Sequence, residues 1–374
     1  MTSTENDVLS EIPKTQRTWT VSCSTPARSF PLKLNHYAPT PPKLPPASSN
    51  NTLIIKLHYS SLNPVDLFLV TSIPLFLPWR RHPIPAFDFA GVVVSAGSSV
   101  SCGFKKGDYV AGAMGIKEVW LGMGTLSEYI EVDCRICTKV PDGLVTGAGP
   151  GFGLDKIVGV AGIAGQTAQQ MVERVRGEQG VRGKRVLVYG ASGGVGSLVV
   201  QICRGLGCEK VWGVCSGGNK GLVEGLGGEV IDYTKHDDII SHLAERFSSD
   251  DQNQLDVVFE CAESHDRLFA KADHFLKPDG QFISVIGGWS QGVLPFIRNK
   301  MRPTFLGGVP RSYDLFLLGA SGEIARKAVE YLERGVVREV LIDSEFGMED
   351  VIEAFERLAT GRAKGKVVIK VGSE

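Results

Sequence analysis

A glycine-rich turn between a strand-like run and a helical pattern constrains this chain most. Residues 185–196 read RVLVYGASGGVG, and the apolar run 185–189 is typical of a buried strand. Apolar residues at helical spacing follow from Val195. Free amides and the helix dipole at such a junction favour a phosphate, and glycine lets the backbone approach a pyrophosphate closely. The turn therefore predicts a dinucleotide site, the alternative being a tight connection without a ligand. Its candidate contacts are Gly190, Ser192, Gly193, Gly194, Val195 and Gly196.

The sequence around this turn predicts the class of fold. Between residues 186 and 285, apolar runs alternate with helical stretches, which is typical of parallel βαβ units and a doubly wound α/β sheet. Short β-type runs and turns rich in Pro and Gly fill residues 19–140, which favours a partly closed antiparallel barrel. A chain of 374 residues is long enough to hold both as separate domains.

Charge and hydropathy exclude several classes of partner. The formal net charge is −1 without a long basic run, so there is no electrostatic reason to expect nucleic acid or an anionic membrane. No apolar run reaches the roughly 18 residues of a transmembrane span. The first residues carry Glu5, Asp7 and Glu11 and no apolar core, unlike a signal or transit peptide. We expect a cytoplasmic protein.

The eight cysteines are scattered along the chain, unlike those of a small secreted module. Cys134 and Cys137 form a single CxxC pair, and a structural zinc site would need a second pair nearby. We therefore expect two reduced thiols at the end of a strand, in a reducing compartment.

Residues 216–220, after the next predicted strand, bear on the choice of dinucleotide. A site for NAD has an acidic residue here, whose carboxylate accepts from the ribose 2′-hydroxyl. This chain has Ser216, Asn219 and Lys220, and a hydroxyl, an amide and a cation suit the 2′-phosphate of NADP(H). Tyr233 would close over the same end of the cofactor. The alternative for Lys220 is a solvated surface lysine.

Eight segments in a consistent order resemble one known family. They are SLNPVDLF (61–68), PIPAFDFAGVV (83–93), GFKKGDYV (103–110), GTLSEY (124–129), AGQTAQQ (164–170), GASGGVG (190–196), LKPDGQFI (276–283) and GRAKGKVVIKV (361–371). Together they resemble the zinc-free quinone oxidoreductase and enoyl reductase-like branch of the medium-chain dehydrogenase/reductase superfamily. After a polar tail at 1–16, the resemblance implies a GroES-like, mainly β catalytic domain from 17–155 and 341–374. It also implies a Rossmann domain at 156–340 and a homodimer.

The chain departs from the zinc-dependent relatives at their metal ligands. Those relatives place a cysteine where this chain has Asn63, and a His-Glu pair where it has Phe87 and Asp88. Phenylalanine and asparagine side chains are not thiolate or imidazole ligands, so the sequence predicts no metal site. Without a Lewis acid a conjugated acceptor is easier to reduce than a simple ketone. The negative charge then spreads into an enolate or quinol that hydrogen-bond donors stabilise.

Three residues are candidates for catalysis, each with a structural alternative. Asn63 would orient the substrate or the nicotinamide carboxamide, or else belong to a turn. Asp66 would act as an acid, or else bind backbone amides. Some relatives have a tyrosine acid where this chain has Phe68, and Tyr129 would replace it, or else pack at the end of a strand.

The resemblance also implies four cofactor contacts outside the glycine turn. They are Thr167, Ile286, Gly287 and Lys366. The alternative for Thr167 is a plain helix N-cap, and for Lys366 it is a surface ion pair. For the other two, the alternative is an ordinary turn after a strand.

Two apolar segments, 67–81 and 293–319, are not required by a dinucleotide fold. We expect four of their residues to line a large hydrophobic substrate mouth, because pockets for apolar ligands have few polar groups. These residues are Phe68, Leu75, Trp79 and Phe296. Core or dimer-interface packing is the alternative.

The sequence thus favours an NADPH-dependent, metal-free reductase that transfers hydride to a hydrophobic quinone or α,β-unsaturated carbonyl compound. One alternative is an enoyl reductase dedicated to a lipid or polyketide pathway. The other, of a different class, is an NADPH-binding sensor or scaffold without turnover.

Overall fold

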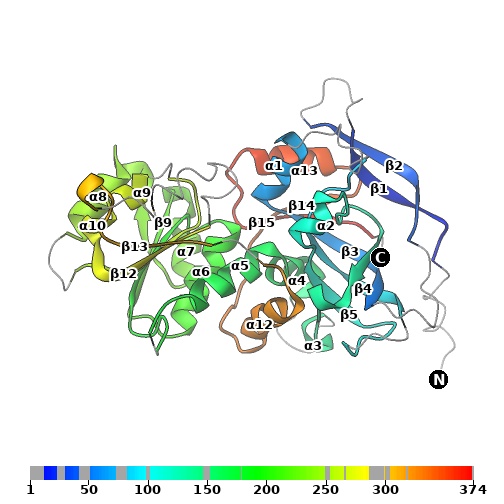
Figure 1. Cartoon of the computed structure of the whole chain (residues 1–374), viewed down its shortest axis with the longest axis horizontal. Helices are drawn as coiled ribbons and strands as arrows, with labels where there is room; N and C mark the ends of the chain where they lie inside the picture. The colour runs from blue at the N-terminus through cyan, green and yellow to red at the C-terminus, as the bar shows by residue number, and fades with distance from the viewer. Residues whose placement is uncertain are drawn as a thin grey trace.

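A computed structural model of the chain describes residues 12–22, 30–41, 51–72, 82–97, 102–145, 152–177, 179–248, 253–264, 267–285, 299, 304–316 and 319–372. Two large β-sheets lie side by side along its longest axis (Figure 1). Three helices lie between the sheets: α4 (Gly153–Ala161), α5 (Ile163–Glu173) and α12 (Gly322–Glu333). In these ranges no helix is both long and apolar enough to cross a membrane.

The first sheet is parallel and six-stranded, in the order β10-β9-β8-β11-β12-β13. Its strands are β8 (Arg185–Tyr189), β9 (Lys210–Cys215), β10 (Glu229–Asp232), β11 (Leu255–Glu260), β12 (Leu276–Ser284) and β13 (Ser312–Leu315). This order is that of a doubly wound dinucleotide-binding sheet, in which ligands bind at the carboxyl ends of the strands where the order reverses. The predicted α/β fold class is confirmed.

The residue pattern explains why β8 lies at the centre of this sheet. Val186, Leu187 and Val188 are fully buried, because helices cover both faces of a parallel sheet. The chain crosses over through helices α6 (Gly194–Gly205), α7 (Lys220–Gly225), α8 (Ile239–Arg246), α9 (Arg267–Ala270) and α10 (Ala272–Phe275). Leu198 and Val199 of α6 are buried, as their helical spacing predicts.

The second sheet has strands from both ends of the chain and is antiparallel apart from one parallel pair, β14 with β15. Its order is β14-β15-β3-β4-β5-β7, and β6 also pairs with β3. The strands are β3 (Thr52–Leu62), β4 (Asp88–Ala96), β5 (Tyr109–Ala113), β6 (Tyr129–Asp133), β7 (Cys137–Lys139), β14 (Ile342–Gly347) and β15 (Lys366–Lys370). The domain boundaries named above stay a prediction.

Smaller elements surround the second sheet. β1 (Thr15–Val21) pairs with β2 (Leu32–Pro39) in a separate two-stranded sheet, so β1 begins inside the predicted polar tail. Helix α1 (Pro64–Ser72) packs against α13 (Val351–Ala359). Short helices α2 (Ile116–Trp120) and α3 (Asp142–Val145) complete this half of the molecule (Figure 1).

The structure corrects the prediction for the CxxC pair. Cys134 is joined by a disulfide to Cys102, and their Cα atoms are 6.3 Å apart. Cys137 is a free, buried thiol whose pKa is raised by burial. The partner was missed because it lies 32 residues away, beyond β5 and β6, and only strand pairing brings the two cysteines together.

Candidate active site

The glycine turn has the geometry that a pyrophosphate requires. Gly190 follows β8 with φ of +87°, a conformation that L side chains rarely adopt. Helix α6 begins at Gly194, and its N-cap residue, Gly193, has no side chain to cap the first amides. Those amides and the positive end of the helix dipole are therefore available to an anion.

Gly196 and Gly193 differ in the free space around them, and the difference indicates where a ligand would lie. A Cβ at Gly196 would lie 2.2 Å from the carbonyl oxygen of Gly190, so glycine is required there for packing. A Cβ at Gly193 would meet only that same oxygen, at 3.5 Å. Gly193 therefore leaves open space that a phosphate can fill, which is the arrangement expected of a dinucleotide turn.

The segment after β9 meets this turn directly. The Asn219 side-chain amide donates to the Ser192 hydroxyl at 3.0 Å, which joins two predicted cofactor contacts from different βα connections. The Oδ1 atom of Asn219 is buried without a hydrogen-bond partner. A buried acceptor without a donor is costly, so this atom indicates a polar ligand group beside Ser192. Ser216 is the N-cap of the short 3₁₀ helix Gly217–Asn219, which ends at Asn219.

The charges at this edge are mixed. Lys220 begins α7, and its amine lies 3.7 Å from Glu224 in an exposed ion pair. Tyr233 is half-exposed, just after β10. Sequence reasoning missed Asp232, the last residue of β10. Its carboxylate lies against Gly217 and binds the amide and hydroxyl of Thr234. Those bonds hold the pKa of Asp232 below its usual range.

The second sheet touches the glycine turn through its last strand. The Gly365 amide donates to the Ser192 carbonyl at 3.1 Å, and Gly365 forms a bridge with Gly193. Gly365 has φ of +94°, and a Cβ there would lie 2.1 Å from the Leu341 carbonyl oxygen. Only glycine allows this contact between the two sheets.

The next residue, Lys366, points its side chain into the protein instead of toward solvent. Its Nζ atom donates to Asn63 Oδ1 at 2.6 Å, Asp88 Oδ2 at 3.0 Å and the Leu62 carbonyl at 3.0 Å. Its side chain is only 4% exposed. The pairing of β15 with β3 explains this, because Val367 lies opposite Leu62. The surface ion pair considered for Lys366 is therefore excluded.

Asp88 is the centre of this group. Its Oδ2 atom also accepts from Ser61 Oγ at 2.7 Å and from Asn63 Nδ2 at 2.8 Å. Its Oδ1 atom accepts from the Ile163 amide at 2.7 Å, at the first residue of α5. A buried carboxylate is thus held by an ammonium, a hydroxyl, an amide and a helix N-terminus, which satisfies its charge. We call Ser61, Asn63, Asp66, Asp88 and Lys366 the Asn63 cluster.

Asp66 is the fifth member, and it is completely buried. Its Oδ2 atom accepts from the backbone N–H of Asn63 at 2.6 Å, while Oδ1 has no hydrogen-bond partner. Burial and then the nearby Asp88 charge raise the pKa of Asp66 to about 8. Asp66 is therefore mainly a neutral carboxylic acid at pH 7. It also binds a backbone amide, which was the structural role that the sequence offered for it as the alternative to an acid.

The structure separates Tyr129 from this cluster. Tyr129 pairs with Lys56 in β3, seven residues before Asn63, or roughly 20 Å along the strand. Burial and the charge of Glu128 raise the pKa of its phenol. Thr167 is buried at the fifth residue of α5, so its N-cap alternative is wrong, the N-cap being Gly162.

Several predicted residues lie outside the described ranges. They are Leu75, Trp79, Ile286, Gly287 and Phe296. Phe68 is described, and its half-buried ring packs against the core of the second sheet.

The structure adds an apolar surface that sequence reasoning missed. Ala113 pairs with Asp88 across β5 and β4, and α2 begins three residues later, so α2 lies at the end of the sheet that holds the Asn63 cluster. Four large apolar side chains are exposed on it and just after it: Ile116, Trp120, Leu121 and Met123. The apolar run at 119–121 was the available signal. We call these residues the α2 patch.

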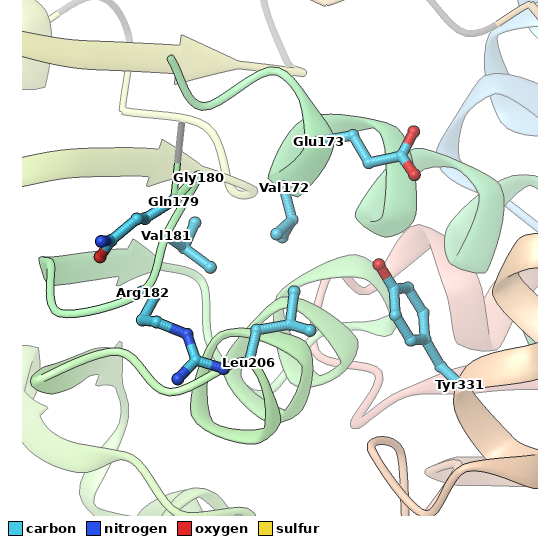
Figure 2. A pocket seen from close by; sticks show the side chains of 8 residues that line it. All are labelled: Val172, Glu173, Gln179, Gly180, Val181, Arg182, Leu206 and Tyr331. Atoms are coloured by element: carbon cyan, nitrogen blue, oxygen red, sulfur yellow. The ribbon is translucent and has the colours of Figure 1, made fainter. Parts of the chain in front are cut away.

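A cavity of about 260 Å³ lies elsewhere, between α5, α6 and α12 (Figure 2). Val172, Leu206 and Tyr331 face the same space (Figure 2). Val181 and Arg182, which also line it, precede β8. The cavity is therefore at the amino end of that strand, opposite the glycine turn, and does not belong to the dinucleotide site.

Comparisons with known proteins agree with this architecture. The family model described as an alcohol dehydrogenase GroES-like domain matches residues 49–142, and that described as a zinc-binding dehydrogenase matches 226–369. The medium chain reductase pydE of Acremonium sp is 33% identical and aligns over 96% of this chain and 99% of its own length. The trans-enoyl reductase pgmF of Aspergillus terreus is 30% identical, over 97% and 98%. The quinone oxidoreductase structure from Coxiella burnetii has a TM-score of 0.74 at 22% identity, over 96% and 100%.

A doubly wound dinucleotide sheet joined to a GroES-like sheet at a glycine turn defines a two-domain oxidoreductase with a nicotinamide cofactor. The chain belongs to the medium-chain dehydrogenase/reductase superfamily, in its zinc-free quinone and enoyl reductase-like branch.

The zinc named in one family model does not fit the donors of this site. Asn63 offers an amide and Phe87 a buried ring, neither of which is a thiolate or imidazole. The carboxylate that the Asn63 side chain binds, Asp88, is already bound by the Lys366 ammonium. Among the described residues, no group of three or more His, Cys, Asp or Glu could hold a metal ion.

Proposed function

We propose that this protein is an NADPH-dependent reductase of hydrophobic α,β-unsaturated carbonyl compounds or quinones, and that it works without a metal ion. One observation carries the proposal. The Asn63 cluster, reached from the glycine turn through Gly365 and Lys366, has an amide where a metal-dependent relative has a cysteine ligand, and the Lys366 ammonium is bound to that amide.

The cofactor site supports a dinucleotide with a 2′-phosphate. The backbone amides of the glycine turn would hold the pyrophosphate. The adenosine ribose would face Ser216, the unpartnered oxygen of Asn219, and Lys220. Two carboxylates oppose a second anion there: Asp232, which binds the Thr234 amide and hydroxyl, and Glu224, which pairs with Lys220 on the exposed surface. Because both carboxylates already have partners, the hydroxyl, the amide and the cation favour NADPH. A nicotinamide cofactor bound at this site would supply the hydride.

The Asn63 cluster suits a conjugated acceptor better than a simple ketone. In the proposed reduction the β-carbon of the substrate gains a hydride, the C=C electron pair shifts into the bond between the α-carbon and the carbonyl carbon, and the C=O electron pair moves onto oxygen. A proton from water then completes the α-carbon. The charge is spread over an enolate, so hydrogen-bond donors such as the Asn63 amide can stabilise it without a Lewis acid.

The α2 patch supports a hydrophobic acceptor. It lies at the end of the sheet that holds the Asn63 cluster, and apolar linings with few polar groups are typical of such pockets. Each methylene that a substrate buries there contributes about 0.8 kcal/mol.

A chelator-treated enzyme assayed against a panel of acceptors tests the proposal. We expect oxidation of NADPH faster than NADH with long-chain enones and quinones, and slow turnover of saturated ketones. Loss of activity on chelation with recovery on zinc addition would contradict it. So would equal rates for enones and saturated ketones.

The similarity to the trans-enoyl reductase pgmF favours a second candidate, reduction of an enoyl thioester within a lipid or polyketide pathway. An N-acetylcysteamine enoyl thioester would then be reduced with a higher kcat/KM than a free enone of equal chain length. Cofactor binding without turnover of either would instead indicate a sensor or scaffold. The homodimer and the cytoplasmic location also stay proposals, which light scattering and cell fractionation test.

A further inference from the structure

Lys366 has no free hydrogen with which to contact a ligand. An ammonium carries three hydrogens, and the Nζ atom of Lys366 has three acceptors: the Leu62 carbonyl, Asn63 Oδ1 and Asp88 Oδ2. Lys366 is also almost fully buried. Lys366 therefore cannot donate a hydrogen bond to a substrate itself, and a hydrogen-bonded route for its charge leads through one of these three partners.

Asn63 is the partner that can transmit the charge. Its Oδ1 atom takes the Lys366 hydrogen, and its Nδ2 atom donates one hydrogen to Asp88 at 2.8 Å. A side-chain amide has two such hydrogens, so one remains without an acceptor among the residues that the structure describes. The pair Lys366 and Asp88 also dictates the orientation of the amide, because the reverse orientation would place the amide hydrogens against the ammonium.

We propose that Lys366 is a positioning residue that locks and polarises the Asn63 amide, so that its free N–H binds the oxygen on which negative charge develops. A cation on the amide oxygen draws electrons from the nitrogen, which makes the remaining N–H a stronger donor. The inference rests on the proposed reduction. In it the positive charge of Lys366 stabilises the substrate oxygen through the Asn63 amide and without touching the substrate.

The surroundings place this amide near the cofactor turn. The Cβ position of Gly194, the first residue of α6, is 3.2 Å from Lys366 Cδ. Gly365, the residue before Lys366, is bonded to Ser192 of the turn. The Lys366 side chain thus contacts the first residue of α6, whose N-terminus would hold the pyrophosphate, and its Nζ atom binds the Asn63 amide.

The test removes the charge without leaving an unpaired ion. Lys366→Met alone would leave Asp88 as a buried carboxylate without its cation, which is strongly destabilising. The double variant Lys366→Met with Asp88→Asn removes both charges of the pair. Lys271→Met is the matched control, because it makes the same substitution at an exposed lysine between α9 and α10. Circular dichroism and NADPH fluorescence titration establish that each variant folds and binds cofactor.

Single-turnover reduction of chalcones with substituents of graded electron demand is the kinetic readout. We expect the double variant to be slower by roughly 10- to 100-fold, which is less than the roughly 100- to 1,000-fold for loss of one oxyanion donor, because the Asn63 amide is weakened and not removed. The rate should also depend more steeply on the substituent, because the substrate must then stabilise its own oxygen charge. Asn63→Ala should slow the wild-type enzyme but change the double variant less than twofold. A slower reaction with an unchanged substituent slope, or two additive effects, would overturn the proposal.

A spectroscopic readout separates this inference from the proposed function. In ¹⁵N-labelled protein the two Asn63 side-chain hydrogens, assigned through Asn63→Ala, should have widely separated shifts, and these should converge in the double variant. Unchanged resonances in that variant would overturn the positioning role whatever the activity. Convergent resonances in a protein that reduces neither enones nor quinones would support the positioning and overturn the proposed reaction.

Discussion

Gly365 donates its backbone amide to the carbonyl of Ser192 at 3.1 Å, and this bond ties the two sheets at the point where a pyrophosphate would lie. The next residue, Lys366, turns inward and bonds to Asn63. Gly365, the residue before β15, and Lys366, the first residue of β15, therefore connect the dinucleotide turn with the Asn63 cluster.

Gly193 and Gly196 should respond differently to alanine. Gly193→Ala meets only one atom within 4 Å, so the protein should keep its stability. The methyl group would occupy pyrophosphate space, and NADPH affinity should fall roughly tenfold or more, or about 1.4 kcal/mol. Gly196→Ala should instead lower the free energy of unfolding by about 1–3 kcal/mol. Fluorescence titration and urea unfolding measure both effects, and similar behaviour of the two variants would place the ligand elsewhere.

Cofactor choice should depend on the opposed charges of Lys220 and Asp232. Lys220→Ala removes a cation worth about 1.5–3 kcal/mol to a phosphate, so NADPH affinity should fall roughly tenfold or more with NADH little changed. Asp232→Asn keeps an oxygen for the Thr234 amide but removes the opposing charge, so NADPH affinity should rise. Dissociation constants for both cofactors check this. An equal loss for NADPH and NADH in Lys220→Ala would place Lys220 outside the 2′-phosphate site.

Stability should fall with rising pH because of Asp66. Its pKa of about 8 in the folded protein lies above the ordinary value of 3.8, so the folded state binds the proton more tightly. The contribution is complete below about pH 4 and is lost as the pH rises to about 8, with a slope of up to about 1.4 kcal/mol per pH unit. Asp66→Asn does not titrate and should lack this slope. Urea unfolding of both proteins across this range measures it, and parallel pH profiles would contradict the shifted pKa.

The Cys102–Cys134 disulfide should stabilise the protein. Its loop spans 32 residues, so Cys102→Ser should lower the free energy of unfolding by about 2–4 kcal/mol under oxidising conditions and by much less in the presence of reductant. Peptide mapping without reduction identifies the pairing. Cys137→Ser, at a buried free thiol, is the control, and its change in stability relative to the wild-type protein should be the same with and without reductant. A map that contains only free Cys102 would show that the bond does not form.

Local features of the fold were predictable from the sequence. The apolar run of β8, the glycines after it and the helical pattern of α6 lie within about twenty residues, and each follows from backbone conformation and side-chain spacing. The alternation of strands and helices likewise implied a parallel sheet. Asn63 and Asp66 were recognised because their motif is contiguous.

The Asn63 cluster itself needed the tertiary structure. Lys366 and Asn63 are 303 residues apart, and only the register of β15 against β3 brings them together. The register of β6 against β3 places Tyr129 away from the site, and the pairing of β10 with β9 brings Asp232 to the cofactor edge.

The sequence by itself determined a dinucleotide turn, a two-sheet fold and the replacement of the metal ligands, because these depend on neighbouring residues. Only the tertiary structure decided which distant groups come together. It pairs the Lys366 ammonium with Asp88, joins Cys102 to Cys134, and places the α2 patch at the end of the sheet that holds Asn63. The reason is physical, since the energy of a buried charge or thiol depends on what the folded chain packs against it, and sequence separation does not encode that distance.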